Sequence, residues 1–236
     1  MYTCNHAQCA PCHMANYEKR EMDYVCEYLD KRFRLSLLTG AFIDIGAHVG
    51  LWSLRLSEWY ITRYNRVPNI FALEADADNF KVLTRNAYES KSTGINPHCA
   101  AAWDKREKVT MWRSSHPARH YVTEMPIGTV ADSFSMQGIP LDSVMCGEFD
   151  AMKIDVEGAE MKVVMGARKL LKKNPHMLLV VEYSVDNFAR FHYKAAQLTT
   201  LLAECGFTPA RPIDEQIVKN IIPGELKRVM FVKGAI

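Results

Sequence analysis

The sequence predicts an α/β fold built on a mostly parallel sheet, and three observations predict it. Buried-type strands alternate with helical patterns along the chain, which is the rhythm of parallel βαβ units. The first strand, at 41–45, ends in a turn that contains Gly46 and Gly50 and opens a helix at 51–64. Near the C-terminus, the segments 207–213 and 227–232 predict an antiparallel pair.

The remaining elements follow the same alternation. Further strands are expected at 69–74, at a segment that ends near 99–102, and at 109–112, 149–155 and 176–182. Helices are expected at 76–90, 159–173 and 194–204, with one or two helices at 14–38 before the first strand. We therefore divide the chain into a cysteine-rich tail and helical preface, 1–38, and a main domain, 39–236.

The segment 113–138 is the least regular part of the sequence. Long connections in compact domains are usually functional or mobile. We expect a substrate lid here, and a plain surface loop is the alternative. His116 and His120 lie in this segment and are candidate bases if the lid closes over a site.

The turn after the first strand has the spacing of a ligand-binding loop. Gly46 and Gly50 allow the backbone to turn tightly and to approach a ligand closely. Their G-x-x-x-G spacing differs from the G-x-G-x-x-G that places a dinucleotide pyrophosphate on a helix. With Asp44 before the first glycine, the pattern favours S-adenosylmethionine over NAD.

The second strand ends in an acidic residue, Glu74. A carboxylate offers only acceptors, so it can bind both ribose hydroxyls of an adenosyl group. The alternative is a solvated acid at the strand end. Asp76 follows and is expected to cap the helix at 76–90.

Charged residues end the predicted strand at 149–155. Lys153, Asp155 and Glu157 alternate with apolar residues, so an extended backbone places all three on one side. Three charges are costly to bury unless they are paired, which favours the open carboxyl end of the sheet, where ligands bind. The alternative is a structural Lys–Asp pair, with Glu157 and Glu160 favouring the helix N-terminus.

Together these motifs resemble the FkbM-type methyltransferases, a branch of the class I S-adenosylmethionine-dependent enzymes. The matching segments are 43–50, 74–86, 139–144, 153–160 and 166–182. The resemblance implies a Rossmann-like class I methyltransferase fold, with a mostly parallel seven-stranded sheet, helices on both faces and a C-terminal antiparallel hairpin. Two positions depart from the family pattern: His48 stands where Asn is more usual, and Ala75 where Pro is more usual.

The motifs and the resemblance together imply S-adenosylmethionine as the cofactor. Contacts with it are expected at Asp44, Gly46, Ala47, His48, Gly50, Glu74, Ala75, Asp76, Ala101, Ala102 and Asp155. The small side chains of Ala101 and Ala102 leave room for a flat adenine ring, and the resemblance places adenine contacts there too.

Methyl transfer from a sulfonium is an in-line displacement, so catalysis is mainly alignment and desolvation, with a base when the acceptor is a hydroxyl. Asp155 is the first candidate for that base or for a group that orients the acceptor. Glu157 is expected to orient the acceptor or to help Asp155 hold a divalent cation. Lys153 is expected to stabilise the carboxylates or a developing alkoxide. Glu182, at the end of the fifth strand, completes the acidic cluster.

The resemblance alone implies the substrate class, O-methylation of a hydroxyl on a sugar, glycan or secondary metabolite. A small-molecule or glycan acceptor is therefore the expected partner, with a homo-oligomer as an option. A ribose 2′-O-methyltransferase of RNA and a degenerate fold that only binds partners remain alternatives. An NAD-dependent or nucleotide-sugar oxidoreductase is disfavoured, because the G-x-G-x-x-G and Tyr-x-x-x-Lys patterns are missing.

Composition excludes several other classes. The 236 residues are 48% hydrophobic, which suffices for one sizeable core. The formal charge of +2 creates no field for nucleic acid or a membrane surface. No apolar run approaches the ~20 residues that a membrane span needs. The first residues do not resemble a signal peptide, and seven scattered cysteines fit a reducing cytoplasm.

The N-terminus carries a cluster of potential metal ligands, namely Cys4, His6, Cys9, Cys12 and His13. Three thiols and a histidine could supply the four ligands of a structural zinc ion. However, there is no second C-x-x-C pair, and a tail with spare thiols is the alternative. The C-x-x-C-H pattern of haem attachment is disfavoured, because the sequence shows no signal peptide.

Overall fold

The computed structural model describes residues 18–90, 94–114, 120–122 and 130–233. Seven strands form the main sheet in the order β10-β11-β9-β8-β1-β2-β3. Its strands are β1 (Ala41–Ile45), β2 (Asn69–Glu74), β3 (Ile95–Cys99), β8 (Ala151–Ile154), β9 (Leu178–Ser184), β10 (Thr208–Pro209) and β11 (Leu226–Val232). All neighbours from β3 to β9 are parallel, whereas β11 is antiparallel to both β9 and β10. This confirms the predicted sheet and its antiparallel C-terminal pair, although the strand expected at 207–213 is shortened to β10 because α9 begins at Pro212.

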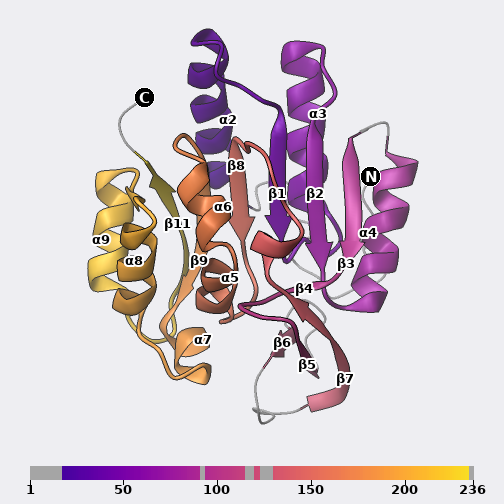
Figure 1. Cartoon of the computed structure of the whole chain (residues 1–236), viewed down its shortest axis with the longest axis vertical. Helices are drawn as coiled ribbons and strands as arrows, with labels where there is room; N and C mark the ends of the chain where they lie inside the picture. Colours follow the sequence, from indigo (N-terminus) through magenta and orange to yellow (C-terminus); the bar gives the residue numbers. More distant parts are fainter. Residues whose placement is uncertain (1–17, 91–93, 115–119, 123–129, 234–236) are drawn as a thin grey trace.

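Helices cover both faces of this sheet (Figure 1). They are α2 (Lys19–Arg34), α3 (Leu51–Tyr64), α4 (Ala77–Glu89), α5 (Glu160–Gly166), α6 (Arg168–Lys173), α7 (Val185–Arg190), α8 (Ala195–Glu204) and α9 (Pro212–Asn220). Successive strand residues point to opposite faces. Phe42 therefore packs in the cluster formed with α2 and α3, whereas Ile43 and Ile45 pack in the cluster formed with α5, α6 and α8.

Helix α2 belongs to the same packed unit as the sheet. Val25 and Leu29 are fully buried in the cluster that contains Phe42. Arg32 of α2 donates two hydrogen bonds to Oδ1 of Asp150, the residue just before β8, at 3.2 and 3.0 Å. Asp150 also accepts from the backbone N–H of Thr39 at 3.0 Å. These hydrogen bonds thus hold helix α2 against the sheet near the amino ends of β1 and β8.

The helix expected at 159–173 is wrong in one respect, because the structure divides it into α5 and α6. The chain leaves helical geometry at Ala167, with φ −115° and ψ 7°. Asp142, in a short 3-10 turn, accepts hydrogen bonds from the backbone N–H groups of Lys169 and Leu170 at 2.9 and 2.8 Å. Asp142 therefore caps the N-terminal end of a second helix, α6, and this interrupts the single helix that was expected.

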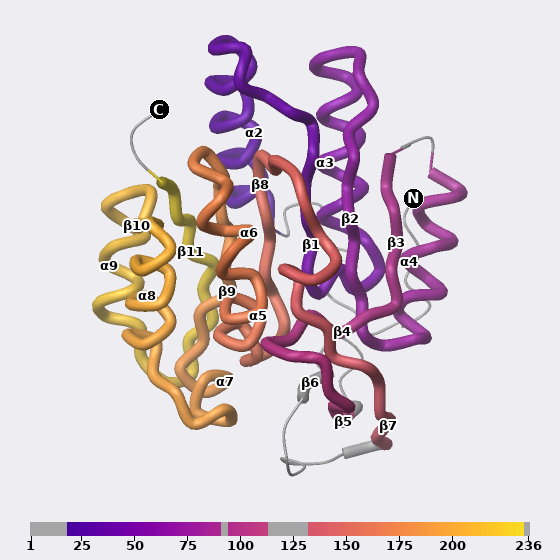
Figure 2. The backbone as a smooth tube through the Cα atoms, viewed as in Figure 1, coloured from indigo at the N-terminus to yellow at the C-terminus, as the bar shows by residue number. Residues whose placement is uncertain are grey.

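The described residues of the segment 113–138 are not irregular as expected but lie in strands, and the substrate lid stays a prediction. A second, four-stranded sheet has the order β4-β7-β5-β6, with β4 (Ala101–Ala102), β5 (Glu107–Ser114), β6 (His120–Val122) and β7 (Val130–Ile139). The strand expected to end near 99–102 stops at Cys99, and the two alanines pair with β7 instead. Figures 1 and 2 show this sheet beyond the carboxyl ends of β1, β2 and β8.

Several predicted features lie outside the described residues. These are Cys4, His6, Cys9, Cys12 and His13 at the N-terminus and His116 of the expected lid. His120 begins β6. Among the described residues, no helix has the length and apolar character needed to cross a membrane.

Candidate functional site

The turn between β1 and α3 forms the base of the candidate site. Gly46 and Gly50 have φ of +74° and +86°, the left-handed region that favours glycine. A Cβ on Gly46 would lie 1.8 Å from the backbone oxygen of Asp155, so only glycine fits between the two loops. His48 adopts φ +53° in the same turn. The backbone N–H groups of Gly46 and Ala47 both donate to the carbonyl of Leu73, at 3.0 and 2.9 Å.

Glu74 joins this turn to the end of β2. Its two carboxylate oxygens accept the backbone N–H groups of His48 at 2.7 Å and of Asp76 at 2.8 Å. The side chain is buried, and this burial raises the pKa of Glu74 to about 7, against the opposing effect of the two N–H donors. Each oxygen has a second lone pair, so the carboxylate can still accept hydroxyl groups.

Asp76 has a structural role in these contacts. Its Oδ1 accepts the backbone N–H groups of Asp78 and Asn79 at 2.8 and 3.0 Å, which confirms the predicted cap of α4. Ala75 packs against the small apolar cluster that contains Ala101. Ala75 directly follows Glu74, so this apolar cluster lies beside the strand end that carries Glu74.

A network of opposite charges lies between β1 and β8. Lys153 Nζ is 3.6 Å from Asp44 Oδ1 and 3.4 Å from Asp155 Oδ2, and it donates to the carbonyl of Gly46 at 3.3 Å. Burial acts to lower the pKa of Lys153, but the carboxylates of Asp155 and Asp44 outweigh it and raise that pKa. Asp44 also accepts from Ser53 Oγ at 2.7 Å, and burial raises its pKa. Lys153 is thus held as a cation.

A second cation, Arg228 of β11, completes the network. Arg228 lies opposite Glu182 in the register of β11 and β9. Its guanidinium reaches Asp155 Oδ2 through Nη2 at 2.8 Å and also contacts Glu18 Oε1 at 2.8 Å. Burial acts to raise the pKa of Asp155, but Lys153 and Arg228 together hold that pKa well below its ordinary value. Asp155 is therefore an ionised carboxylate with two cationic partners.

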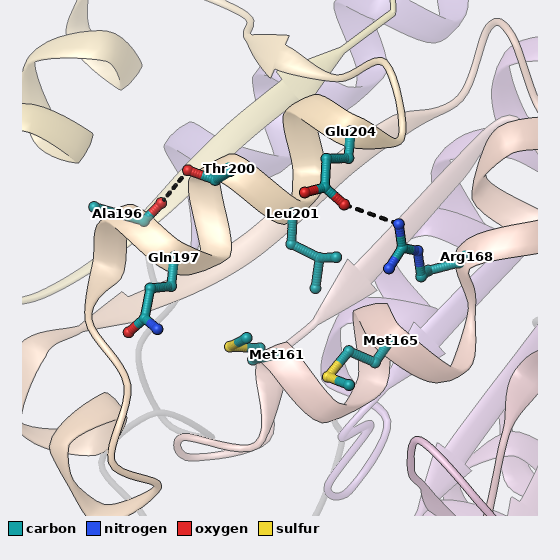
Figure 3. A pocket seen from close by; sticks show the side chains of 8 residues that line it. All are labelled: Met161, Met165, Arg168, Ala196, Gln197, Thr200, Leu201 and Glu204. Carbon is teal, nitrogen blue, oxygen red and sulfur yellow. Dashed lines mark hydrogen bonds and ion pairs between the residues drawn. The ribbon is translucent and has the colours of Figure 1, made fainter.

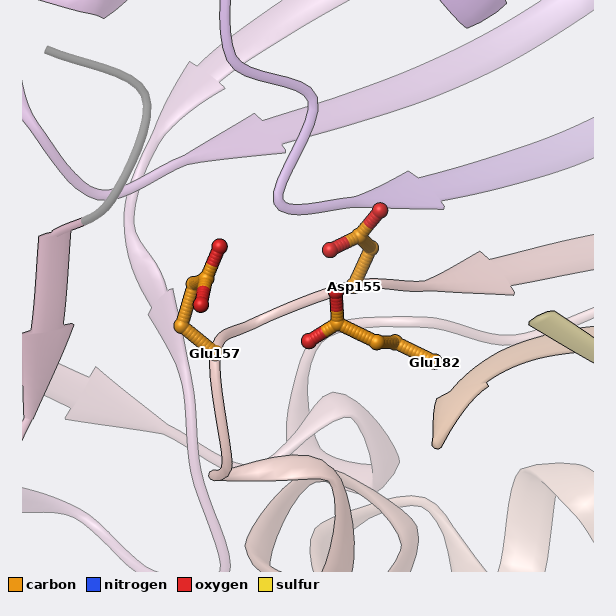
Figure 4. Close-up of side chains that lie close together, drawn as sticks. All are labelled: Asp155, Glu157 and Glu182. Carbon is orange, nitrogen blue, oxygen red and sulfur yellow. The ribbon is translucent and has the colours of Figure 1, made fainter. Parts of the chain in front are cut away.

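Glu157 and Glu182 complete an acidic cluster with Asp155, and Figure 4 shows the three side chains facing one another. Asn187 links two of them, because its Nδ2 donates to Glu157 Oε2 at 3.1 Å and to Glu182 Oε2 at 3.2 Å. Burial, and next the charge of Asp155, raise the pKa of Glu182 well above its usual value. A protonated Glu182 can then donate toward Asp155.

Glu160 stabilises the turn that carries Glu157 by accepting two of its backbone N–H groups. Glu160 Oε1 accepts the backbone N–H groups of Val156 at 3.0 Å and of Gly158 at 3.3 Å. Tyr193 donates to the carbonyl of Gly158 at 2.7 Å. Burial raises the pKa of Glu160 to about 8. These contacts hold Glu157 in a left-handed conformation, with φ +54°.

The acidic cluster has the spacing of a cation site, because one oxygen from each of Asp155, Glu157 and Glu182 lies within 4.8 Å of the others. Two of its three carboxyl groups are compensated by the surrounding protein. Asp155 is paired with Lys153 and Arg228, and the pKa of Glu182 is raised. Glu157 accepts a hydrogen bond from the neutral side chain of Asn187.

The structure brings together the predicted residues Asp44, Lys153, Asp155, Glu157 and Glu182, whereas sequence reasoning missed Glu18, Asn187 and Arg228. Arg228 lies in the predicted strand 227–232, but that strand was expected to pair with 207–213, and its pairing with β9, which places Arg228 opposite Glu182, was not predicted. Glu18 and Asn187 precede or lie in helices far from the motifs, and no sequence pattern indicates them.

A hollow lies between α5 and α8, away from the charged residues of the site, and Figure 3 shows its lining side chains. Met161, Met165 and Leu201 form its apolar part, and an ion pair between Arg168 and Glu204, 2.8 Å long, closes one side. This groove contains none of the charged residues of the site.

Solved structures share the fold at low sequence identity. Precorrin-6y C5,15-methyltransferase from Geobacter metallireducens GS-15 is 13% identical, with a TM-score of 0.51; the match covers 94% of this chain and 90% of that one. The bifunctional kinase-methyltransferase WbdD is 12% identical, with a TM-score of 0.52, and the match covers 92% of this chain and 39% of that one. These two matches show that the chain shares its fold with these structures.

A methyltransferase FkbM from Methylobacillus flagellatus KT is 15% identical, with a TM-score of 0.47; the match covers 92% of this chain and 51% of that one. The chain thus spans about half of that structure's length and less of WbdD. No curated protein resembles the sequence closely enough to count as a relative. The model of the methyltransferase FkbM domain matches residues 44–209, which include Asp44, Glu74, Lys153 and the acidic cluster, whereas Glu18 and Arg228 lie outside this range. The chain belongs to the FkbM methyltransferase family.

Proposed function

We propose that the protein is an S-adenosylmethionine-dependent O-methyltransferase that acts on a hydroxyl group of a sugar, glycan or other small molecule. One observation carries this proposal. Glu74 is a buried carboxylate at a strand end that is hydrogen-bonded to the glycine turn, and the turn in turn contacts the loop of Asp155. An adenosyl-binding acid and a charged acceptor site therefore share one edge of the sheet.

The residues present fit this cofactor. Glu74 keeps acceptor capacity for the ribose hydroxyls, and Ala75 and Ala101 offer small side chains near the same strand end. Asp44 Oδ1 is buried and has no hydrogen-bond partner among the described residues, although Lys153 lies 3.6 Å away. It would accept a hydrogen bond from the ammonium group of the ligand. When bound, S-adenosylmethionine supplies an electrophilic methyl group on a sulfonium.

The carboxylates of Asp155 and Glu157 are assigned different roles toward the acceptor hydroxyl. Asp155 has a lowered pKa because of Lys153 and Arg228, so it is a weak base and a good hydrogen-bond acceptor. We assign it the role of orienting the acceptor hydroxyl. Glu157, held by Asn187 on the turn above Glu160, is our candidate to take the hydroxyl proton. Lys153 would stabilise negative charge that develops on the acceptor oxygen.

The cofactor assignment is tested by isothermal titration of the purified protein with S-adenosylmethionine, S-adenosylhomocysteine and NAD. Micromolar binding of both adenosyl ligands and no binding of NAD is the expected result. Binding of NAD alone would overturn the proposal. Absence of all binding would favour a degenerate fold, which was the alternative from the sequence.

The catalytic assignment is tested by transfer of a labelled methyl group to a panel of hydroxyl acceptors. Asp155→Asn and Glu157→Gln are expected to keep the affinity for S-adenosylhomocysteine within about threefold of wild type. Turnover is expected to fall by about 100-fold or more. Glu148→Gln is the matched control, because Glu148 is exposed and precedes β8 at the opposite edge of the sheet. Unchanged turnover in both site variants would show that the acidic cluster only supports the fold.

A further inference from the structure

Arg228 is shared between two carboxylates that come from distant parts of the chain. Its Nη2 lies 2.8 Å from Asp155 Oδ2 and 2.8 Å from Glu18 Oε1, and its Nε lies 3.3 Å from the same oxygen of Asp155. The side chains of Arg228 and Glu18 are 13% and 9% exposed. The contact with Asp155 belongs to the charge network of the site, whereas the contact with Glu18 comes from outside it.

The side chain of Glu18 does not cap the helix that it precedes, although its backbone carbonyl accepts the N–H of Met22 at 2.9 Å. Glu18 occupies the N-cap position of α2, yet its side chain makes no capping hydrogen bond. Its backbone has φ +55°, an uncommon conformation for a residue with a long side chain. Burial raises the pKa of Glu18, and Arg228 and Lys153 only partly oppose this. The carboxylate is therefore placed beside Arg228 at a cost in free energy.

The charge balance of the site does not require Glu18 either. Two cations, Lys153 and Arg228, face two carboxylates, Asp44 and Asp155. Glu18 adds a third carboxyl group around these two cations, and the charges of Asp44 and Asp155 act on it. A carboxylate from a bound ligand could take its place without changing the local charge.

We propose that Arg228 is a carboxylate-binding residue of the site, and that Glu18 stands in for the ligand's carboxylate while the site is empty. A guanidinium with five N–H donors can hold Asp155 and a second carboxylate at once. That carboxylate has two possible sources, the amino-acid end of S-adenosylmethionine or an acidic acceptor such as a sugar acid. The inference rests on the proposed function, because it assumes an adenosyl ligand beside Asp155.

The experiment compares ligands that differ only in the presence of the carboxylate-bearing part. S-adenosylhomocysteine and 5′-methylthioadenosine share the adenosyl group, but the second lacks the amino-acid end. Both are titrated into wild type, Glu18→Gln and Arg228→Gln. D-glucuronate and D-glucose are then titrated into the protein saturated with S-adenosylhomocysteine. Glu225→Gln and Lys227→Gln are controls with the same charge changes, since both residues are exposed neighbours of Arg228.

If the cofactor supplies the carboxylate, Glu18→Gln binds S-adenosylhomocysteine about tenfold more tightly and Arg228→Gln about tenfold less tightly, with 5′-methylthioadenosine unchanged. If the acceptor supplies it, both adenosyl affinities stay constant. In that case Glu18→Gln gains affinity for D-glucuronate, Arg228→Gln loses it, and D-glucose is unaffected. Either pattern supports the inference.

Two results would overturn it. One is that all variants and controls bind each of the four ligands with the same affinity. The other is a loss in Arg228→Gln without a gain in Glu18→Gln, because that is the effect of leaving Asp155 without its counter-charge. Binding of S-adenosylhomocysteine in either case leaves the proposed function standing. If wild type binds no adenosyl ligand, both the proposed function and this inference are wrong.

Discussion

Glu74 accepts the backbone N–H of His48 at 2.7 Å, so the acid that ends β2 is directly joined to the glycine turn that follows β1. The same carboxylate accepts the backbone N–H of Asp76 and thereby orders the start of α4. One side chain thus fixes the relative position of the two loops that are expected to contact the adenosyl group. Its loss should affect ligand binding through both geometry and a missing hydrogen-bond acceptor.

We expect Glu74→Ala to weaken binding of S-adenosylhomocysteine by about 10- to 100-fold, the effect of losing a charged hydrogen-bonding group. Titration calorimetry measures this directly. Glu89→Ala is the control, because Glu89 is exposed at the end of α4, whose start follows Glu74. Equal affinity in wild type and Glu74→Ala would refute the ribose-binding assignment.

The buried pair of Arg32 and Asp150 should dominate the attachment of α2. Both side chains are nearly inaccessible, and removal of Arg32 leaves a buried carboxylate without its counter-charge. We expect Arg32→Ala to lower the free energy of unfolding by about 3 kcal/mol or more. Arg63→Ala is the comparison, since its pair with Asp30 is partly exposed and should lower the free energy of unfolding much less. Urea unfolding measures both, and equal losses would contradict the expectation.

Glu160 should make the protein less stable at alkaline pH. Its pKa is raised to about 8 in the folded protein by burial, whereas the ordinary value is 4.5. The folded state therefore binds the proton more tightly, and this contribution is complete below pH 4.5 and lost as the pH rises through about 8. Gln mimics the protonated side chain. We expect the fall in melting temperature between about pH 5.5 and about pH 8.5 to be smaller in Glu160→Gln.

Glu74, whose pKa is raised to about 7, contributes to the same window, so part of the slope should remain in that variant. Asp155 does not, because its lowered pKa places its contribution at acidic pH. Glu148→Gln, which removes an exposed carboxylate, should keep the full wild-type slope. A parallel shift of the whole curve in Glu160→Gln, with no change of slope, would show that Glu160 remains ionised.

Sequence periodicity and motif spacing predicted the parallel strands well, because buried strands and glycine turns leave local signals. The bounds expected for the helix 51–64 and the strand 69–74 agree with α3 and β2. Glu74 and Asp155 follow their strands directly, so parallel topology alone brings their loops to one edge of the sheet. That part of the candidate site required no knowledge of long-range contacts.

The contacts that escaped prediction depend on tertiary geometry. Arg228 reaches Asp155 across a strand order that places β9 between β11 and β8. Asn187 lies in a six-residue helix, too short for a periodic pattern to reveal. The break at Ala167 arises because Asp142, distant in sequence, caps a second helix. None of these pairings leaves a signal within a local window of sequence.

Gly166 offers a test in which local propensity and tertiary packing predict opposite results. It is the last residue of α5, where Ala would favour the helix by about 1 kcal/mol. A Cβ at this position would, however, lie 1.9 Å from the backbone oxygen of Trp103. A backbone atom cannot rotate away as a side chain does, so the helix or the chain after β4 must shift.

We therefore expect Gly166→Ala to lower the free energy of unfolding by about 1–3 kcal/mol, the range for an overpacked core. Trp103 packs with Ala101, Val109 and Ala159, so its displacement should also disturb the small sheet and the start of α5. Met165→Ala is the control, because Met165 is 40% exposed on the same helix and its loss should cost about 1 kcal/mol or less. Urea unfolding of wild type, Gly166→Ala and Met165→Ala measures these free energies. A gain of stability in Gly166→Ala would mean that α5 can move away from the chain after β4, and that the close contact with Trp103 does not constrain this edge of the site.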